Sequence, residues 1–173
     1  MRIIYQSSDI IIREFLPEEQ VLFTSLFEDE EVIRHLPRRT REQYVEIFQA
    51  SLTAYGNSPF SRWGIFTTAG SGFAGMCLIR EFADVPGQVE LGYSLGRSYW
   101  GRGIATECVR ALTAYGFAGT DTAEMVAVTT LENIGSQKAL LKGGFTQQQN
   151  LKRAEEELAY FLLSRAEYEE GKA

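Results

Sequence analysis

The sequence has few residues that could bind a metal or form a disulfide. It contains two cysteines, Cys77 and Cys108, and a single histidine, His35. The cysteines lie in apolar stretches at a spacing that fits no zinc or redox motif, so we expect two buried thiols. A lone histidine at the end of an apparent helix more often caps or packs than catalyses. The sequence therefore predicts no metal cofactor.

Long apolar runs are also missing. No stretch reaches the roughly 18 to 20 apolar residues of a membrane span, and residues 1–8 lack the apolar run of a signal peptide. We therefore expect a cytoplasmic protein without a membrane partner. The 17 Lys and Arg against 23 Asp and Glu give a net charge of −6. This excess of acid argues against direct nucleic-acid binding and favours a cationic partner.

What remains is the composition of an ordinary globular protein. Apolar residues make up 45% of the 173 residues and charged residues 23%, which is enough for one well-packed core. No internal repeat, low-complexity tract or linker divides the chain. We therefore predict a single domain over residues 1–173.

Residue patterns predict the order of strands and helices. Strand-like composition occurs at residues 9–15, 62–68, 72–82, 88–95, 124–130, 145–149 and 158–164. Helices are expected to begin near Pro17, at the capping box Thr40-Arg41-Glu42-Gln43, at the glycine-rich segment 99–106 and at Asn133. The order predicts an α+β protein with a mixed central sheet of about six to seven strands flanked by about four helices, including one right-handed helical crossover. The acidic end is expected to be a solvated tail.

A glycine-rich segment, residues 100–106, connects a predicted strand to a predicted helix. Consecutive backbone amides at a helix N-terminus favour an anion such as a pyrophosphate. Basic residues are expected on or near the same side of this segment: Arg97, Arg102, Lys138 and Lys142. The segment therefore suits nucleotide phosphates, although the glycines could also serve a tight connection alone.

Two well-known phosphate loops do not match this segment. A P-loop requires Gly-Lys followed by Ser or Thr, and neither follows Gly103. A dinucleotide-binding fingerprint requires a third glycine where Thr106 stands, and it follows an early strand rather than three antiparallel ones. We therefore reject the first and disfavour the second.

The segment Trp100-Gly101-Arg102-Gly103-Ile104-Ala105 resembles the acetyl-CoA motif of the GNAT superfamily, Gln/Arg-x-x-Gly-x-Gly/Ala, with Trp100 in place of the usual Gln or Arg. Together with neighbouring motifs it resembles the RimJ/RimL-type branch; these motifs are Glu90-Leu91-Gly92-Tyr93, Glu107, Asn133-x-x-Ser136 and Lys142-Gly-Gly-Phe145. The resemblance implies the GNAT (acyl-CoA N-acyltransferase) fold and acetyl-CoA as co-substrate.

The resemblance also implies where coenzyme A binds. Two central strands that splay apart are expected to hold it, with pantetheine on the backbone near Ser94 and Leu95 and pyrophosphate on the amides of residues 102–106. The expected cofactor-binding residues are Ser94, Leu95, Arg97, Trp100, Gly101, Arg102, Gly103, Ile104, Ala105, Thr106, Asn133 and Lys138.

Two catalytic candidates follow from the chemistry of acetyl transfer, which needs a neutral amine and a proton for the departing thiolate. Glu90 resembles a superfamily glutamate that removes the amine proton through water, or it is an ordinary strand carboxylate. Leu140 occupies the position where many GNAT enzymes carry a tyrosine acid. By resemblance to the RimJ/RimL-type branch, Ser136 is the candidate acid, or else it is an ordinary solvated helix residue. Asn133 either caps a helix or also touches coenzyme A.

We therefore expect direct acetyl transfer from acetyl-CoA to a primary amine in a ternary complex. The acceptor would be a cationic protein N-terminus, a polyamine or an aminoglycoside, drawn by acidic runs at residues 28–31 and 155–157 unless these are only solvated surface. Tyr93 and Trp100 could shape the acceptor channel, and a homodimer is compatible with this function. The alternatives are an inactive coenzyme A-binding module and an interaction domain with a purely structural glycine turn.

Overall fold

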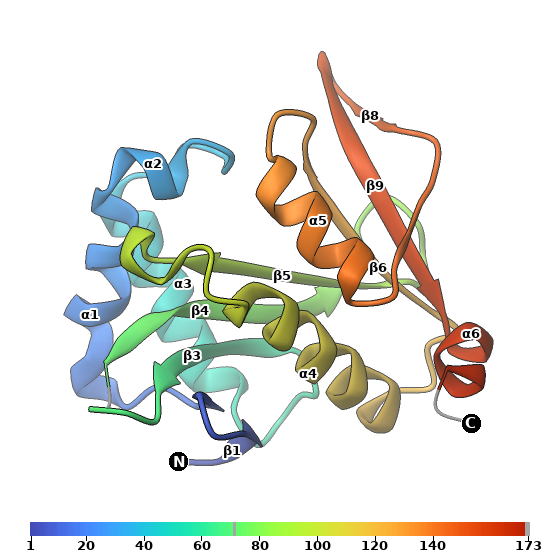
Figure 1. Cartoon of the computed structure of the whole chain (residues 1–173). Helices are drawn as coiled ribbons and strands as arrows, with labels where there is room; N and C mark the ends of the chain where they lie inside the picture. Colours follow the sequence, from blue (N-terminus) through green and yellow to red (C-terminus); the bar gives the residue numbers. More distant parts are fainter. Residues whose placement is uncertain (71, 172–173) are drawn as a thin grey trace. The chain divides into compact units, whose positions relative to one another are not determined.

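The computed structural model describes residues 1–70 and 72–171 (Figure 1). The chain forms two compact units. Unit 1 comprises Met1–Leu78 and Tyr93–Ile104, and unit 2 comprises Ile79–Gly92 and the chain from Ala105 onwards. Strands β4 (Phe73–Glu81) and β5 (Val89–Leu95) contribute residues to both. The two units are described separately below.

Unit 1 contains three antiparallel strands and several short helices. The strands are β1 (Ile3–Gln6), β2 (Ile10–Arg13) and β3 (Ser61–Thr67). The helical elements are η1 (Pro17–Glu19), α1 (Gln20–Ser25), η2 (Leu26–Glu28), α2 (Glu30–Ile33) and α3 (Arg41–Ala54). At the start of α3, Thr40 Oγ1 accepts from the Gln43 amide (3.3 Å) and Gln43 Oε1 accepts from the Thr40 amide (2.9 Å). The predicted capping box is therefore confirmed.

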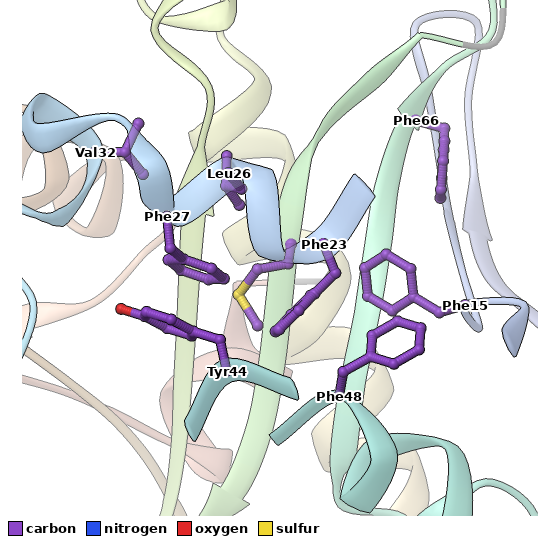
Figure 2. Close-up of a cluster of buried hydrophobic side chains, with 9 residues drawn as sticks. Phe15, Phe23, Leu26, Phe27, Val32, Tyr44, Phe48 and Phe66 are labelled. Carbon is purple, nitrogen blue, oxygen red and sulfur yellow. The ribbon is translucent and has the colours of Figure 1, made fainter. Parts of the chain in front are cut away.

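The core of unit 1 is mainly aromatic (Figure 2). The ring centroids of Phe15 and Phe23 lie 5.5 Å apart in an edge-on arrangement, and Phe27 stacks on Tyr44 at 4.0 Å. Edge-on and stacked rings are both favourable geometries, and each buried ring removes a large apolar area from water. The aromatic side chains of this cluster therefore form much of the hydrophobic core of unit 1.

Tyr55 joins three segments of unit 1 through its hydroxyl. The hydroxyl donates to the Arg62 carbonyl (2.5 Å), just after the start of β3, and accepts from the Phe15 amide (3.1 Å) beyond β2. Burial raises the pKa of Tyr55, so the hydroxyl stays protonated and can donate. One side chain thus satisfies a backbone donor and a backbone acceptor that are far apart in sequence.

Replacing Tyr55 with Phe should lower the free energy of unfolding by about 1–3 kcal/mol, because both backbone groups lose a partner in a largely desolvated place. Urea denaturation measures the change. Tyr44→Phe is the matched control, because it removes the hydroxyl of another buried tyrosine of unit 1 and keeps the ring that stacks on Phe27. Equal effects of the two substitutions would show that the Tyr55 bridge contributes nothing specific.

Unit 2 is built around a long strand. It contains most of α4 (Ile104–Gly119) and the elements β6 (Glu124–Thr130), α5 (Ile134–Lys142), β7 (Thr146–Gln147), β8 (Leu151–Arg153), β9 (Glu156–Ser164) and α6 (Arg165–Glu170). β9 pairs with β6, β7 and β8, always antiparallel. Figure 1 shows α5 beside β6. The start of β5 pairs with β6 in parallel, as predicted for strands joined by a helical crossover.

Arg165 fastens the end of α4 in unit 2. Its guanidinium donates to three carbonyl oxygens, those of Phe117 (2.9 Å), Thr120 (2.7 Å) and Thr122 (3.0 Å). The last carbonyls of a helix have no partner within the helix, and a cation is favourable at this negative end of the helix dipole. The acidic end predicted as a solvated tail forms the helix α6, which starts at Arg165, and its residues Glu167, Glu169 and Glu170 are exposed.

The described residues form nine strands in one sheet of order β1-β2-β3-β4-β5-β6-β9-β7, with β8 on β9, and six α-helices. The predictions of about six to seven strands and about four helices were therefore too low. Short elements explain the difference. β1 precedes the first predicted strand, and the region near residues 145–153 divides into β7 and β8.

Candidate functional site

The glycine-rich segment continues from the end of β5 to the start of α4. The Gly96 amide donates to the Ala74 carbonyl (2.9 Å), so the pairing with β4 extends one residue beyond β5. A 3-10 turn, η3 (Arg97–Tyr99), then reverses the chain, and α4 begins at Ile104, directly after Gly103. The predicted strand, loop and helix are therefore present. Residues 104–106 form the first helical turn, whose amides have no acceptor within the helix.

Gly101 and Gly103 both have left-handed backbones, with φ of +72° and +83°. Glycine adopts this conformation with little cost, whereas other residues are strained by it. A Cβ atom added at either position would meet nothing within 4 Å. The glycines are thus required by the turn itself, and the space over them is open to a ligand.

Two arginines lie on this loop. Arg97 and Arg102 are exposed, and the Arg102 guanidinium lies 5.6 Å from the centroid of the Tyr99 ring. Exposed guanidinium groups next to helix-terminal amides favour a phosphate. Lys138 and Lys142 belong to α5 in unit 2, so their predicted position beside the loop stays a prediction.

The end of β5 is shaped by two residues with a structural role that the sequence did not reveal. A Cβ on Gly75 would lie 2.1 Å from the Ser94 carbonyl oxygen, so only glycine lets β4 approach β5 this closely. The indole Nε1 of Trp100 donates to the Leu95 carbonyl (2.8 Å). Trp100 was predicted as a cofactor contact, and its bond back to β5 adds a role within the protein.

Glu90 is paired with an arginine. Its side chain is buried, with 6% exposure, and Oε2 accepts from Arg80 Nε at 2.6 Å. Arg80 was not among the predicted site residues, although the hairpin offered a signal. Phe82 pairs with Gln88 across the turn, so Arg80 and Glu90, two residues further along each antiparallel strand, lie opposite each other.

The parallel pairing of β5 with β6 ends at Glu90. It joins Val89 to Met125 and Glu90 to Val126 and extends no further along these two strands, all of whose residues the structure describes. Two central strands that pair at one end only are what the GNAT resemblance implies. Glu90 therefore occupies the last position of β5 that pairs with β6.

The start of α5 has the geometry of a helix cap. Asn133 Oδ1 accepts from the Ser136 amide (3.2 Å), and its Nδ2 donates to Thr129 Oγ1 (3.0 Å). The capping role predicted as one alternative for Asn133 is therefore confirmed. Leu140 is buried, as a core residue would be. The half-buried Ser136 lies in the first turn of α5, and its role as an acid stays a prediction.

The acidic run at residues 28–31 has local partners. Glu28 lies 3.9 Å from Arg41, Glu31 lies 3.6 Å from Arg34, and Asp29 caps α2 by accepting from the Glu31 amide. These ion pairs are largely exposed, so they leave much of the local negative charge to solvent.

The second acidic run, residues 155–157, lies at and after the turn between β8 and β9. Glu157 faces Lys152 across the two strands and accepts from Asn150 Nδ2 at 3.1 Å. Glu156 likewise faces Arg153. Part of this acidic charge is therefore balanced by the neighbouring strand.

The structure also shows where the cysteines lie and bears on metal binding and membrane spans. Cys77 and Cys108 are buried thiols, as expected. Within residues 1–70 and 72–171 there is no group of three or more His, Cys, Asp or Glu side chains that could hold a metal. No helix in this described part is long and apolar enough to cross a membrane.

Comparison with known proteins identifies the family. Residues 9–146 match the family described as "Acetyltransferase (GNAT) domain". The chain is 24% identical over 148 residues to the "Uncharacterized N-acetyltransferase YoaA" of Bacillus subtilis, with 84% of each chain covered.

Solved structures share the fold at low sequence identity. One is RimL, a ribosomal L7/L12 alpha-N-protein acetyltransferase in complex with coenzyme A (TM-score 0.80, 17% identity, 94% of this chain and 98% of that one). Another is the aminoglycoside acetyltransferase AAC(6')-Ib with coenzyme A and kanamycin (TM-score 0.78, 16% identity, 95% and 99%). These likenesses confirm the predicted α+β fold. The family match covers most of the sequence, and the chain therefore belongs to the GNAT acetyltransferase family.

Proposed function

We propose that this protein transfers an acetyl group from acetyl-CoA to a primary amine by direct attack in a ternary complex. The observation that carries the proposal is the loop after β5, where two left-handed glycines lead straight into α4 and leave open space over the backbone. Within a family of acetyltransferases, such a loop suits the pyrophosphate of coenzyme A.

The proposed binding residues divide by function. The amides of residues 102–106 bind pyrophosphate, with Arg97 and Arg102 adding positive charge. The backbone at Ser94 and Leu95 is proposed to bond pantetheine. Asn133 and Lys138 are proposed to contact coenzyme A from α5, which for Asn133 would add to its capping role.

The proposed chemistry requires one proton to leave the amine and one to reach the thiolate. As the amine nitrogen bonds the acetyl carbonyl carbon and the carbon–sulfur bond breaks, Glu90 takes the amine proton through water. The ion pair with Arg80 fixes the position of this proposed base, because Glu90 Oε2 accepts a hydrogen bond from Arg80 Nε at 2.6 Å. Ser136 is the proposed proton donor to sulfur.

The proposal for the amine acceptor rests on the net charge of the chain and on the acceptors of structurally similar proteins. RimL and AAC(6')-Ib are described as acting on a protein N-terminus and on aminoglycosides, and both are amine acceptors. The net charge of −6 favours a cationic amine for this chain. Membership of the RimJ/RimL-type branch, a cytoplasmic location and a homodimer are part of this proposal.

A thermal-shift titration tests the cofactor assignment. Acetyl-CoA at 100 times its dissociation constant should stabilise the protein by about 3 kcal/mol, because it binds only the folded state. Adenosine, which lacks the pyrophosphate, is the control and should give a much smaller shift. If acetyl-CoA leaves the melting temperature unchanged, the cofactor assignment is wrong.

A second candidate is a coenzyme A-binding module without catalysis. It is favoured by Leu140, a buried core residue at the position where many relatives are expected to carry a tyrosine acid. A screen of amine acceptors with free-thiol release as the readout separates the two. Binding of acetyl-CoA without turnover on any amine class would favour the module.

A further inference from the structure

The side chain of Trp100 combines two features that rarely occur together. The residue is 48% exposed, yet its indole N–H is engaged by the Leu95 carbonyl at 2.8 Å. The other tryptophan, Trp63, is 2% exposed within β3. The bond to the Leu95 carbonyl therefore fixes the orientation of an indole that is about half exposed.

The bond closes a loop of six residues. From Leu95 the chain passes through Gly96 and the turn Arg97–Tyr99, where Tyr99 N–H donates to the Gly96 carbonyl and Trp100 N–H to the Arg97 carbonyl. The indole then reaches back to the carbonyl on which β5 ends. The chain directly before Gly101 is therefore tied to the sheet at both ends of the turn.

The loop that follows, residues 101–103, has little of its own to hold its conformation. Gly101 and Gly103 have no side chains and no backbone preference that would hold the loop, and a Cβ at either position would touch nothing. Flexible glycines lose much conformational entropy when a ligand orders them. A fixed point immediately before Gly101 lowers that cost, which is the general advantage of a preorganised site.

We infer that Trp100 is a positioning residue whose indole N–H, by holding the Leu95 carbonyl, sets the loop 101–103 in the conformation that binds pyrophosphate. The effect on pyrophosphate binding rests on the proposed function, whereas the ordering of the loop is a property of the protein without ligand. It also explains how a tryptophan can stand where the family motif has Gln or Arg, since all three side chains carry N–H donors.

The test compares three proteins in two measurements. Trp100→Phe keeps a flat ring but removes the N–H, and Trp100→Gln restores a donor in a smaller side chain. Amide hydrogen exchange of residues 96–104 is measured without ligand, and acetyl-CoA affinity and steady-state kinetics follow. In Trp100→Phe these amides should exchange faster, while Trp100→Gln should recover part of the protection.

We expect the variant with faster amide exchange to bind acetyl-CoA more weakly. Loss of the N–H should raise the acetyl-CoA dissociation constant about 2- to 12-fold, the range for one hydrogen bond. It should raise KM more than it lowers kcat. Unchanged exchange in Trp100→Phe overturns the inference. So does an unchanged dissociation constant accompanied only by a lower melting temperature, which indicates a purely structural role.

The two proposals fail in different ways. If the unaltered protein does not bind acetyl-CoA, the proposed function is wrong, and the exchange measurement still decides whether Trp100 orders the loop. If the unaltered protein binds acetyl-CoA and Trp100→Phe binds equally well, the function stands and the positioning role is excluded.

Discussion

Replacing Glu90 with Gln is expected to lower turnover about 10²- to 10⁴-fold, the usual range for a positioned acid or base. An amine acceptor is largely protonated at neutral pH, with a reference pKa of about 10.4 for lysine and about 7.7–8.0 for an α-amine. Gln keeps the size and the hydrogen bonding of Glu90 but cannot accept the proton. The loss should shrink as the pH rises, because more of the acceptor is then already neutral.

Two controls make this result specific. Acetyl-CoA affinity of the Glu90→Gln protein should stay near that of the unaltered protein, since the proposed base acts on the amine. Glu81→Gln removes an exposed carboxylate from the end of β4 and should leave the rate unchanged. If the Glu90→Gln protein has an unaltered rate and pH profile, Glu90 is not the base and serves only as the buried partner of Arg80. Acetyl transfer would then be explained by the positioning of an amine that has already lost its proton in solution.

The second large effect concerns Gly103. Gly103→Val should abolish the rise in melting temperature that acetyl-CoA causes, because a β-branched side chain would stand over the amides that bind pyrophosphate. Valine is also strained at a φ of +83°, which by itself costs about 1–2 kcal/mol. The experiment must therefore distinguish the loss of ligand binding from the loss of stability that backbone strain causes.

Gly56 provides the matched control. It has a φ of +78°, and a Cβ added there would also meet nothing within 4 Å. Gly56→Val therefore introduces similar strain at the end of α3, away from the loop in sequence, and should lower stability while preserving the response to acetyl-CoA. Tight binding by Gly103→Val would leave the glycine with a role in the turn only.

Local features of this protein were predictable from sequence because their causes lie within a few residues. The capping box at Thr40 and the cap at Asn133 depend on side chains three positions apart. The loop at Gly101 and Gly103 has its own turn chemistry, so the junction of β5 and α4 was placed correctly. The residues that determine these features lie close together in sequence, so each segment could be interpreted without knowledge of the rest of the fold.

Contacts that join distant segments were not predictable in the same way. The Tyr55 hydroxyl reaches Phe15, and Arg165 reaches Phe117, because the fold places them together. The need for glycine at position 75 follows only from the close approach of β4 to the Ser94 carbonyl, which the sequence does not show. The pair of Arg80 and Glu90 is intermediate, since the hairpin register implies it once the turn position is known.

The attachment of α4 by Arg165 also bears on the order in which the chain folds as it is made. Unit 1 has all of its segments once Ile104 has been synthesised. Unit 2 has to wait, because β9, the strand that pairs with β6, β7 and β8, and the guanidinium that binds the end of α4 come from its last segments. N-terminal parts generally fold first during synthesis, and long-range pairings close slowly. During translation, therefore, we expect unit 1 to have all of its segments available well before the far end of α4 can gain its guanidinium anchor at residue 165.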